Sequence, residues 1–501
     1  MTTYQIFDYS DKNLKIALDN NQIPINLLEE RNHFKYFQSY LGTTGIGAKT
    51  ILVEEPYVSK AYLIDYSHYY SICFKDYDRH CKRVHFFKAN FEKVKFEKEL
   101  YNSKSSYLND NYLGYIVVKP LPDSIIGPTL LKTYAIREDG IKRYYPSCRQ
   151  YKVNLFGRVL ELESLVYQEQ DTVVAACASV AIWSAFHKTS KLFDTDLPSP
   201  SEITKRGGNL FLNYGRTFPN PGLDITQICK AIESTGLVSE YIISTRFESS
   251  VQLAKRLIYA YNKAGLPILL FLKFDDGVGH LITINGYSDF STEKEKSQEI
   301  SLTADNIEKF YTHDDQIGPF AKMSFPGNEN IQTAWSDSNG DSITAKIHSV
   351  IIPMYRKIRI KFQDVFDKIS LVDQIFFETN LFQLEIEWDI FLIESNEYKQ
   401  QVSKSDYEVI IKKSVGLKNY PKFIWIGRAI IGENILFDFV YDSTDIASGF
   451  FCIDFILYYK EEEFKEILLE HFITYKSVYI DHPGGPKLGV KVYEDIIEKL
   501  A

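Results

Sequence analysis

The amino-acid sequence predicts an α+β protein in which a central region is flanked by two further α+β regions. In the central region, apolar residues recur first at helical spacing and then in strand-like runs, which favours helices followed by an antiparallel sheet. The chain has 501 residues, 45% of them hydrophobic, and no long low-complexity tract. Because a chain of this length is too long to fold around a single hydrophobic core, we expect domains at 1–150, 151–350 and 351–501.

The N-terminal region begins with a helical pattern. Pro24 precedes an apolar periodic tract over residues 25–41, as at a helix start. Strand-like runs follow at 50–54 and 112–120, and Pro and Gly residues over 121–128 predict turns. These patterns indicate an α+β domain and no particular activity.

The central region carries its helical signals before its strands. Helices are expected to start at Cys177, to follow Pro200, to run from Ile225 to near Gly236, and to cover 250–263. A polar stretch at 291–306 predicts a surface loop or a partly ordered insertion. The expected strands are 268–272, one led by His280, and 310–315.

The C-terminal region again mixes both element types. Its expected strands are 385–392, 423–431 and 450–457, and its expected helices are 364–379, 461–472 and 492–500. The sequence leaves three roles open for it: covering a cleft, binding a substrate or recruiting a protein partner.

Cys177 stands where a glutamine-rich segment gives way to an apolar helical run. The unpaired N–H groups and the dipole at a helix start favour a thiolate, which is the nucleophilic form of cysteine. Gly279-His280 leads a strand about a hundred residues on, and Asp314 ends another. A thiol, an imidazole that removes its proton and a carboxylate that orients the imidazole form the set that acyl transfer needs.

Thiol, histidine and aspartate in this order resemble a known arrangement. Residues 162–320 are similar to the papain-like cysteine peptidases, and more closely to their compact bacterial branch, the bacteriocin-processing (double-glycine) peptidases. The resemblance implies a nucleophile at Cys177, a base at His280, an orienting carboxylate at Asp314 and an oxyanion donor at Gln170. That family places its glutamine six residues before the cysteine, where this chain has Asp171. Gln168 therefore stays open as the donor, and Asp315 as the third residue.

Each candidate residue also has a structural interpretation. Cys177 lies among Ala, Val and Ile, and free cysteine is commonly a small buried hydrophobe. His280 fits a strand edge, Asp314 a turn and Gln170 the surface, so it is the joint pattern that favours catalysis. A zinc site of Cys177, His280, His313 and Asp314 uses suitable ligands, but their spacing gives it little support.

Composition excludes several classes of function. A net charge of -9 and a pI near 5.7 disfavour general nucleic-acid binding. The N-terminus lacks a signal-peptide pattern, no apolar run is long enough for a bilayer, and the six cysteines form no framework. We therefore expect a cytoplasmic protein with reduced thiols, no membrane contact, and neither cofactor nor metal.

Two motif-like segments are rejected. Residues 42–50 resemble a phosphate-binding loop, but a strand pattern follows them where such a loop needs a helix. Residues 337–341 lack the glutamate of an EF-hand and predict a plain turn.

The sequence thus predicts a thiol hydrolase that cleaves a peptide or isopeptide bond in a protein or peptide substrate. A transglutaminase or glutamine deamidase would use the same triad. A catalytically degenerate binding module, acting through protein partners of the flanking domains, remains the alternative from another class.

Overall fold

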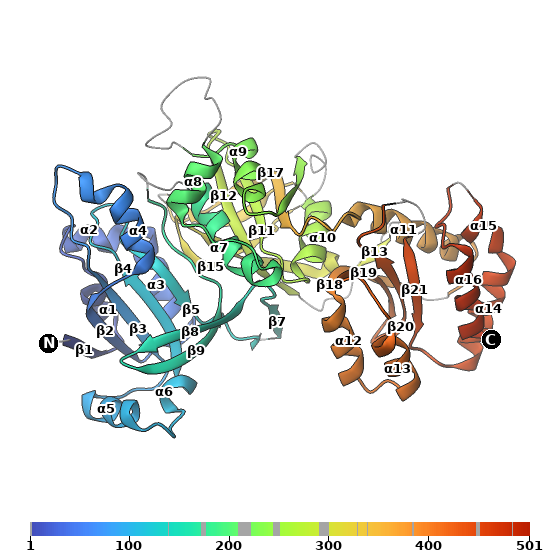
Figure 1. The fold of residues 1–501 in the computed structure, drawn as a ribbon, viewed down its shortest axis with the longest axis horizontal. Coiled ribbons are helices and arrows are strands. Elements are labelled where there is room, and N and C mark those ends of the chain that lie inside the picture. Colours follow the sequence, from blue (N-terminus) through green and yellow to red (C-terminus); the bar gives the residue numbers. More distant parts are fainter. Residues whose placement is uncertain are drawn as a thin grey trace. The chain divides into compact units, whose positions relative to one another are not determined.

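The computed structural model describes residues 3–501 apart from 139, 172–176, 209–221, 244–250, 290–299, 328, 338, 383–384, 447–450 and 483. Helices and strands occur throughout, so the expected α+β class is confirmed (Figure 1). The chain forms two compact units. Unit 1 comprises 1–251, 265–289 and 308–354, and unit 2 comprises 252–264, 290–307 and 355–501. The expected boundaries near 150 and 350 stay a prediction.

Unit 1 begins with an antiparallel sheet in the order β1-β2-β3-β4-β5. These strands are Thr3–Asp8, Thr50–Tyr57, Cys81–Phe87, Tyr112–Val118 and Ile126–Leu131. The helices beside them are α1 (Asp11–Leu18), α2 (Ile25–Glu30), α3 (Asn32–Leu41), α4 (Lys60–His68), α5 (Lys93–Tyr101) and α6 (Tyr107–Asp110). The helix expected over 25–41 is two helices, because Arg31 adopts an extended conformation (φ -68°, ψ 138°).

The second part of unit 1 is a larger sheet covered by helices. Pairings among its described strands close a ring in the order β11, β12, β14, β15, β16, β17 and back to β11. The ring strands are Ile268–Lys273, Gly279–Asp289, Ile307–Asp314, Gly318–Ser324, Ile331–Ser336 and Ser342–Met354. The attached strands are β10 (Val238–Ile243), β7 (Ile141–Tyr144) and β6 (Arg137–Glu138), and β8 (Arg149–Leu155) and β9 (Arg158–Ser164) form a separate hairpin.

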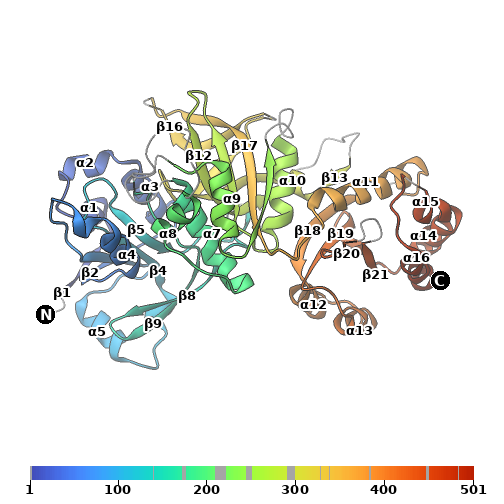
Figure 2. The same cartoon turned by 45° about the horizontal axis from the view of Figure 1, so that its top comes forward.

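The helices of this part follow the sequence signals closely. Helix α7 (Cys177–Phe193) packs on β12, α8 is Pro200–Gly207 and α9 is Ile225–Glu233 (Figures 1 and 2). Ser199 and Asp224 cap α8 and α9, each in a reciprocal capping box. These caps explain why both starts could be predicted from local sequence.

A shared core joins the two parts of unit 1. The buried cluster under the N-terminal sheet includes Phe37, Phe86 and Leu131. It also contains Tyr311 of β14 and Phe320 of β15. The N-terminal sheet therefore packs against the strands that carry the candidate site.

Unit 2 is built on a sheet in the order β13-β18-β19-β20-β21. Its strands are Ser301–Leu302, Glu387–Glu394, Phe423–Ile431, Asn434–Asp442 and Cys452–Leu457. Its helices are α10 (Val251–Asn262), α11 (Phe362–Glu378), α12 (Ser395–Lys404), α13 (Val409–Leu417), α14 (Glu462–Thr474), α15 (Lys476–Ile480) and α16 (Val490–Leu500). β13 pairs in parallel with β18, whereas the other neighbours are antiparallel.

Neither segment 42–50 nor segment 337–341 has the structure of the motif that it resembles in sequence. The segment after Gly42 is a turn that leads into β2, with no helix to receive a phosphate. Asp337 and Asp341 close a turn through the Asp337 N–H to Asp341 carbonyl bond of 2.9 Å. Across the described parts of the chain, the structure has no helix with the length and apolarity that a membrane crossing requires.

Candidate functional site

Cys177 is the first described residue of α7, at the end of the segment 172–176 that lies outside the described residues. Its side chain is half-buried, whereas the next residues, Ala178 to Phe186, are buried. The start of the helix is thus buried in the protein, while the Cys177 thiol at its N-terminal end keeps some exposure. A nucleophile needs this combination of fixed position and access.

His280 is the second residue of β12 and is 4% exposed. Its Nε2 lies 2.9 Å from Oδ1 of Asp314. A side-chain hydrogen bond also links His280 to Cys177. Since Nε2 faces the carboxylate, Nδ1 is the ring nitrogen left for the thiol. The structure therefore brings together the three residues named for the thiol, base and orienting roles.

The charge of the imidazole follows from these contacts. Burial by itself lowers the pKa of His280, but the charge and hydrogen bond of Asp314 and the hydrogen bond of Cys177 outweigh it. The negative charge of Asp315 acts in the same direction, and the pKa of His280 is raised well above its usual value. This environment stabilises an imidazolium next to a thiol, which is the partner that a thiolate needs.

A hydrogen bond between elements sets the distance from helix to strand. The Thr283 hydroxyl on β12 donates to the Ala181 carbonyl of α7 at 2.9 Å. Both residues are buried, and they lie three and four positions beyond His280 and Cys177. This bond therefore fixes the strand that carries His280 against the helix that begins with Cys177.

Asp314 ends β14 and is held at both carboxylate oxygens. Oδ1 accepts the Gln316 N–H at 3.0 Å in addition to facing His280, and Oδ2 accepts the Trp335 indole N–H at 2.7 Å. Burial raises the pKa of Asp314, but His280, Trp335 and the Gln316 N–H together hold it below its usual value. The carboxylate is thus fixed in its charged form.

Trp335 on β16 is a site residue that sequence reasoning missed. Its ring also packs edge-on against His280, with centroids 5.1 Å apart and an interplanar angle of 63°. Trp335 therefore has two effects: its ring shields the buried His280–Asp314 bond, and its indole N–H fixes the Asp314 carboxylate. No local signal marks this tryptophan, because its role depends on β16 lying in the same sheet as β14.

Asp315 lies beside the triad without joining it. Its Oδ1 is 3.6 Å from Nε2 of His280, too long for a hydrogen bond, and its backbone carbonyl accepts from His33 Nε2 at 2.8 Å. Its Oδ2 is buried and has no hydrogen-bond partner among the described residues. Burial, the charge of Asp314 and the charge of Glu169 raise the pKa of Asp315 to about 7, although His280 opposes them.

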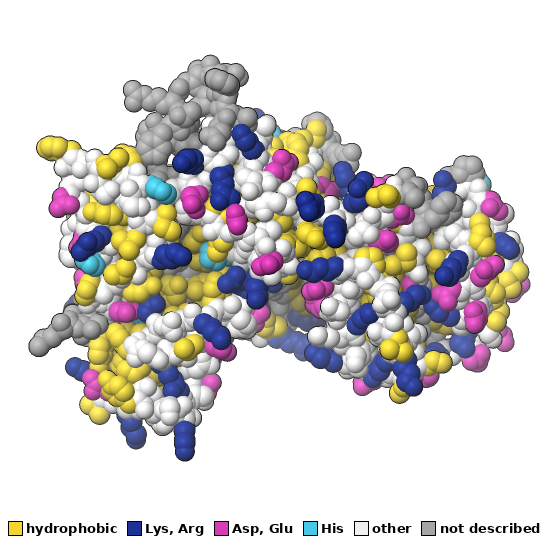
Figure 3. Space-filling view, viewed as in Figure 1, with side chains coloured by type: hydrophobic (Ala, Val, Ile, Leu, Met, Phe, Trp, Pro, Cys, Tyr) yellow, Lys and Arg dark blue, Asp and Glu magenta, His cyan; other side chains and the backbone are white. Residues whose placement is uncertain are grey.

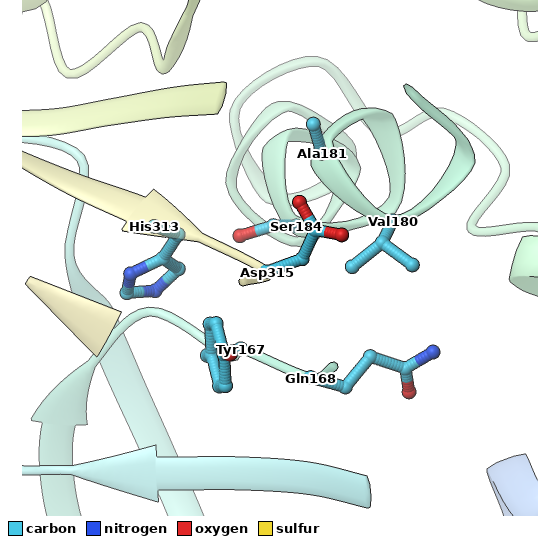
Figure 4. Close-up of a pocket in the computed structure, with 7 residues that line it drawn as sticks. All are labelled: Tyr167, Gln168, Val180, Ala181, Ser184, His313 and Asp315. Atoms are coloured by element: carbon cyan, nitrogen blue, oxygen red, sulfur yellow. The ribbon is translucent and has the colours of Figure 1, made fainter. Parts of the chain in front are cut away.

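A small cavity of about 10 Å³ adjoins this carboxyl group, which is the space that one water molecule needs. Its lining residues are Tyr167, Gln168, Val180, Ala181, Ser184, His313 and Asp315 (Figure 4). In this view the Asp315 carboxyl group points toward α7, whereas the Gln168 side chain extends away from it. Gln168 therefore does not satisfy the free oxygen of Asp315.

His313 has a structural role. Its Nε2 donates to the Leu165 carbonyl at 2.9 Å and its Nδ1 accepts from the Phe320 N–H at 3.2 Å. Burial lowers the pKa of His313 to about 3, so the ring is neutral. Both nitrogens are occupied, which removes His313 from the zinc set considered from the sequence.

A different group could hold a metal ion. Among the described residues, ligand atoms of His280, Asp314 and Asp315 lie within 4.8 Å of one another, and all three side chains are buried. One histidine and two carboxylates suit a divalent cation. In this arrangement, however, His280 already contacts both Asp314 and Cys177.

The two glutamine candidates are less defined. Gln170 is partly exposed. Its neighbour Asp171 accepts from the Tyr70 hydroxyl at 2.5 Å, which ties this segment to the residues after α4. Gln168 is 4% exposed. Because 172–176 lie outside the described residues, the oxyanion donor stays a prediction.

Comparison of the chain with protein-family models and with curated proteins finds no match.

Proposed function

We propose that the protein is a thiol-dependent hydrolase with a papain-like central region, and that it cleaves a peptide or isopeptide bond through Cys177, His280 and Asp314. The observation that carries this proposal is the chain of contacts from the Cys177 thiol through His280 to Asp314. A helix that begins with the thiol and packs on an antiparallel sheet supports the papain-like assignment.

The reaction follows from the positions of these groups. Cys177 Sγ forms a bond to the substrate carbonyl carbon, and the resulting tetrahedral intermediate expels the amine as the C–N bond breaks. His280 gives the amine the proton it took from the thiol. Water then attacks the thioester with His280 as base, the C–S bond breaks, and the acid leaves. Asp314 keeps the imidazole in place during both steps.

Two groups are suited to the developing oxyanion. The backbone N–H of Cys177 lies in the first turn of α7, where it has no partner within the helix. The Gln170 side chain is the second proposed donor, as the resemblance implies. Removing one donor of this kind typically lowers kcat about 10²- to 10³-fold. Transglutaminase or deamidase chemistry would form the acyl-enzyme from a glutamine side chain with loss of ammonia. The acyl group would then pass to an amine in a transglutaminase and to water in a deamidase.

Selective alkylation tests the proposal without knowledge of the substrate. The native protein is treated with limiting iodoacetamide at neutral pH, and the modified cysteines are identified by peptide mass. We expect Cys177 to react first and His280→Ala to suppress that reaction at least tenfold. Cys73 is the internal control, because it is also half-buried but its thiol donates to a backbone carbonyl.

The remaining cysteines make the contrast sharp. Burial raises the pKa of Cys81 to about 12, and it also raises the pKa of Cys148, Cys452 and Cys229. If Cys177 reacts no faster than Cys73, or if His280→Ala leaves its rate unchanged, the binding-module interpretation replaces the enzyme.

A metal-dependent hydrolase is the second candidate, since Asp315 offers a buried free oxygen next to His280 and Asp314. Metal analysis of the purified protein and isothermal titration with zinc distinguish the two. Stoichiometric zinc binding that is lost in Asp315→Asn but retained in Cys177→Ser would favour the metal site.

A further inference from the structure

Unit 2 contains a pocket of about 530 Å³ at the ends of three of its segments. The residues that line it are Tyr355, Arg356, Lys357, Ile358, Arg359, Pro421, Lys422, Phe423, Ser443 and Thr444. This volume lies within the range of small-molecule sites, about 300 to 1,000 Å³. The pocket is formed by unit 2 residues alone and does not depend on the thiol site.

The charged side chains that line this pocket are all cationic. Arg356, Lys357, Arg359 and Lys422 are exposed, and no Asp or Glu is among the lining residues. Lys422 has a further interaction within the structure, whereas none of the ion pairs among the described residues involves Arg356, Lys357 or Arg359. On the face shown in Figure 3, cationic and anionic side chains are interspersed. In a chain of net charge -9, this concentration of cations creates a local field for anions.

Asp442, which directly precedes the lining residues Ser443 and Thr444, makes local hydrogen bonds. Oδ1 of Asp442 accepts both the N–H and the hydroxyl of Thr444, each at 2.7 Å. These bonds direct that oxygen of Asp442 to its own turn. Arg356, Lys357 and Arg359 therefore face a lining that contains no acidic side chain.

The backbone that carries the cations is fixed. The Ile358 N–H donates to the Tyr355 carbonyl at 2.9 Å, and the N–H groups of Arg359 and Ile360 both donate to the Ser443 carbonyl, at 2.7 and 3.0 Å. Ile358 and Ile360 are buried beneath the turn. A fixed turn loses less entropy on binding than a mobile one, so its side chains are partly preorganised.

We propose that this pocket binds a small molecule that carries two or more phosphate groups, of the nucleoside di- or triphosphate class. Two guanidinium groups offer paired N–H donors that match phosphate oxygens, and two ammonium groups add charge. The half-buried Tyr355 ring supplies a surface for a planar base. A concave site on an acidic chain, in place of a basic stripe, favours a small ligand over a nucleic acid.

Isothermal titration of the full-length protein with inorganic pyrophosphate and with ATP tests the proposal. We expect saturable binding of both, weakened at least tenfold in Arg356→Glu/Arg359→Glu and progressively weakened by added salt. The matched control is Lys404→Glu/Lys413→Glu, which makes the same charge change at exposed positions of α12 and α13. Circular dichroism confirms that each variant is folded.

The ratio of the affinities for ATP and pyrophosphate shows which part of the ligand the pocket contacts. ATP binding more tightly than pyrophosphate assigns a role to the ring of Tyr355, and equal binding assigns recognition to the phosphates alone. The proposal is overturned if neither ligand binds saturably below about 5 mM, or if the control double variant weakens binding as much as the pocket variant. If the charge reversal prevents folding, Arg356→Gln/Arg359→Gln is titrated in its place.

Discussion

At the scale of single residues, the site depends on how a buried carboxylate is kept charged. Asp314 is 3% exposed, and it retains its charge because an imidazole, an indole N–H and a backbone N–H all face it. Asp315, its neighbour in sequence, is 4% exposed; its Oδ1 is 3.6 Å from His280 Nε2, and its Oδ2 has no hydrogen-bond donor among the described residues. Two adjacent aspartates therefore have opposite pKa shifts, and only the one with donors is suited to orient His280.

Trp335→Phe should lower both stability and thiol reactivity. The change leaves Asp314 Oδ2 buried without its donor, at a cost of about 1 to 3 kcal/mol in unfolding free energy. We expect slower alkylation of Cys177, because His280 loses a fixed partner. Urea denaturation and the alkylation rate measure the two effects.

Unit 2 supplies a matched control for this substitution. The Trp388 indole N–H donates to Asp373 at the same distance, 2.7 Å. Trp388→Phe should destabilise the protein as well and leave the Cys177 rate unchanged. Equal slowing by both variants would show that the effect is general loosening.

Asp315→Asn should change how stability depends on pH. The pKa of Asp315 is raised from 3.8 to about 7 in the folded protein, so its contribution to stability is present below pH 4 and is lost as the pH rises through 7. Asparagine has no charge to bury. The free energy of unfolding of the variant, relative to that of the parent protein, should therefore rise by up to about 4 kcal/mol between pH 4 and pH 8.

Urea denaturation at pH 4, 6 and 8 checks this expectation. The exposed Asp341→Asn is the control, and its difference from the parent protein should stay constant with pH. Parallel pH curves for the parent and Asp315→Asn would refute the idea that burial of this carboxyl opposes folding.

Some residues of the site have a signal in the local sequence, and others do not. Cys177, His280 and Asp314 each have a local signal, because each stands at the end of an element, and the structure brings them into contact. Trp335 and the free oxygen of Asp315 have no such signal. Their roles depend on side-chain directions across a folded sheet, which no one-dimensional pattern encodes.

At the scale of elements, the site is a helix fastened to a strand. The Thr283 hydroxyl and the Ala181 carbonyl form the link between β12 and α7. Most of these elements were predictable because caps and apolar periodicity are local. The break at Arg31 was not, since it accompanies guanidinium bonds to the distant carbonyls of Pro122 and Asp123. The stretch expected as a loop at 291–306 contains β13, which pairs with the distant β18, and 290–299 lie outside the described residues.

Thr283→Val should loosen the helix of Cys177 from the strand of His280. Valine keeps the shape of threonine but removes the donor to Ala181, at a cost of about 1 kcal/mol. We expect the alkylation rate of Cys177 to fall several-fold. Thr129→Val is the control, because Thr129 is also buried and donates to a backbone carbonyl, but to that of Gly127 and not to the helix that begins with Cys177. If Thr129→Val slows the thiol equally, the helix-to-strand bond is not what positions it.

At the scale of the whole molecule, the N-terminal residues support the site. His33 of α3 donates to the Asp315 carbonyl, and the Tyr36 hydroxyl donates to the Pro319 carbonyl at 2.5 Å. A Cβ at Gly318 would lie 2.2 Å from the Tyr36 ring, so these segments are in close contact. Sequence composition could not reveal this support, because it arises from packing between segments nearly 300 residues apart.

A fragment of residues 151–501 should therefore fail to form a stable site. Removing 1–150 would expose Tyr311 and Phe320, which are buried in the N-terminal core. We expect the fragment to aggregate or to lack a cooperative thermal transition, and to lose selective alkylation of Cys177. A soluble fragment with parental alkylation kinetics would show that the central region is autonomous.

The adjacent placement of β12 and β14 limits how this protein can vary in length. His280 and Asp314 meet because their strands are neighbours in one sheet, and a strand alternates its faces with every residue. Inserting or deleting one amino acid inside either strand would turn one partner to the opposite face and separate the pair. Natural length variation in related chains should consequently fall in the connecting turns, leaving both strands uninterrupted.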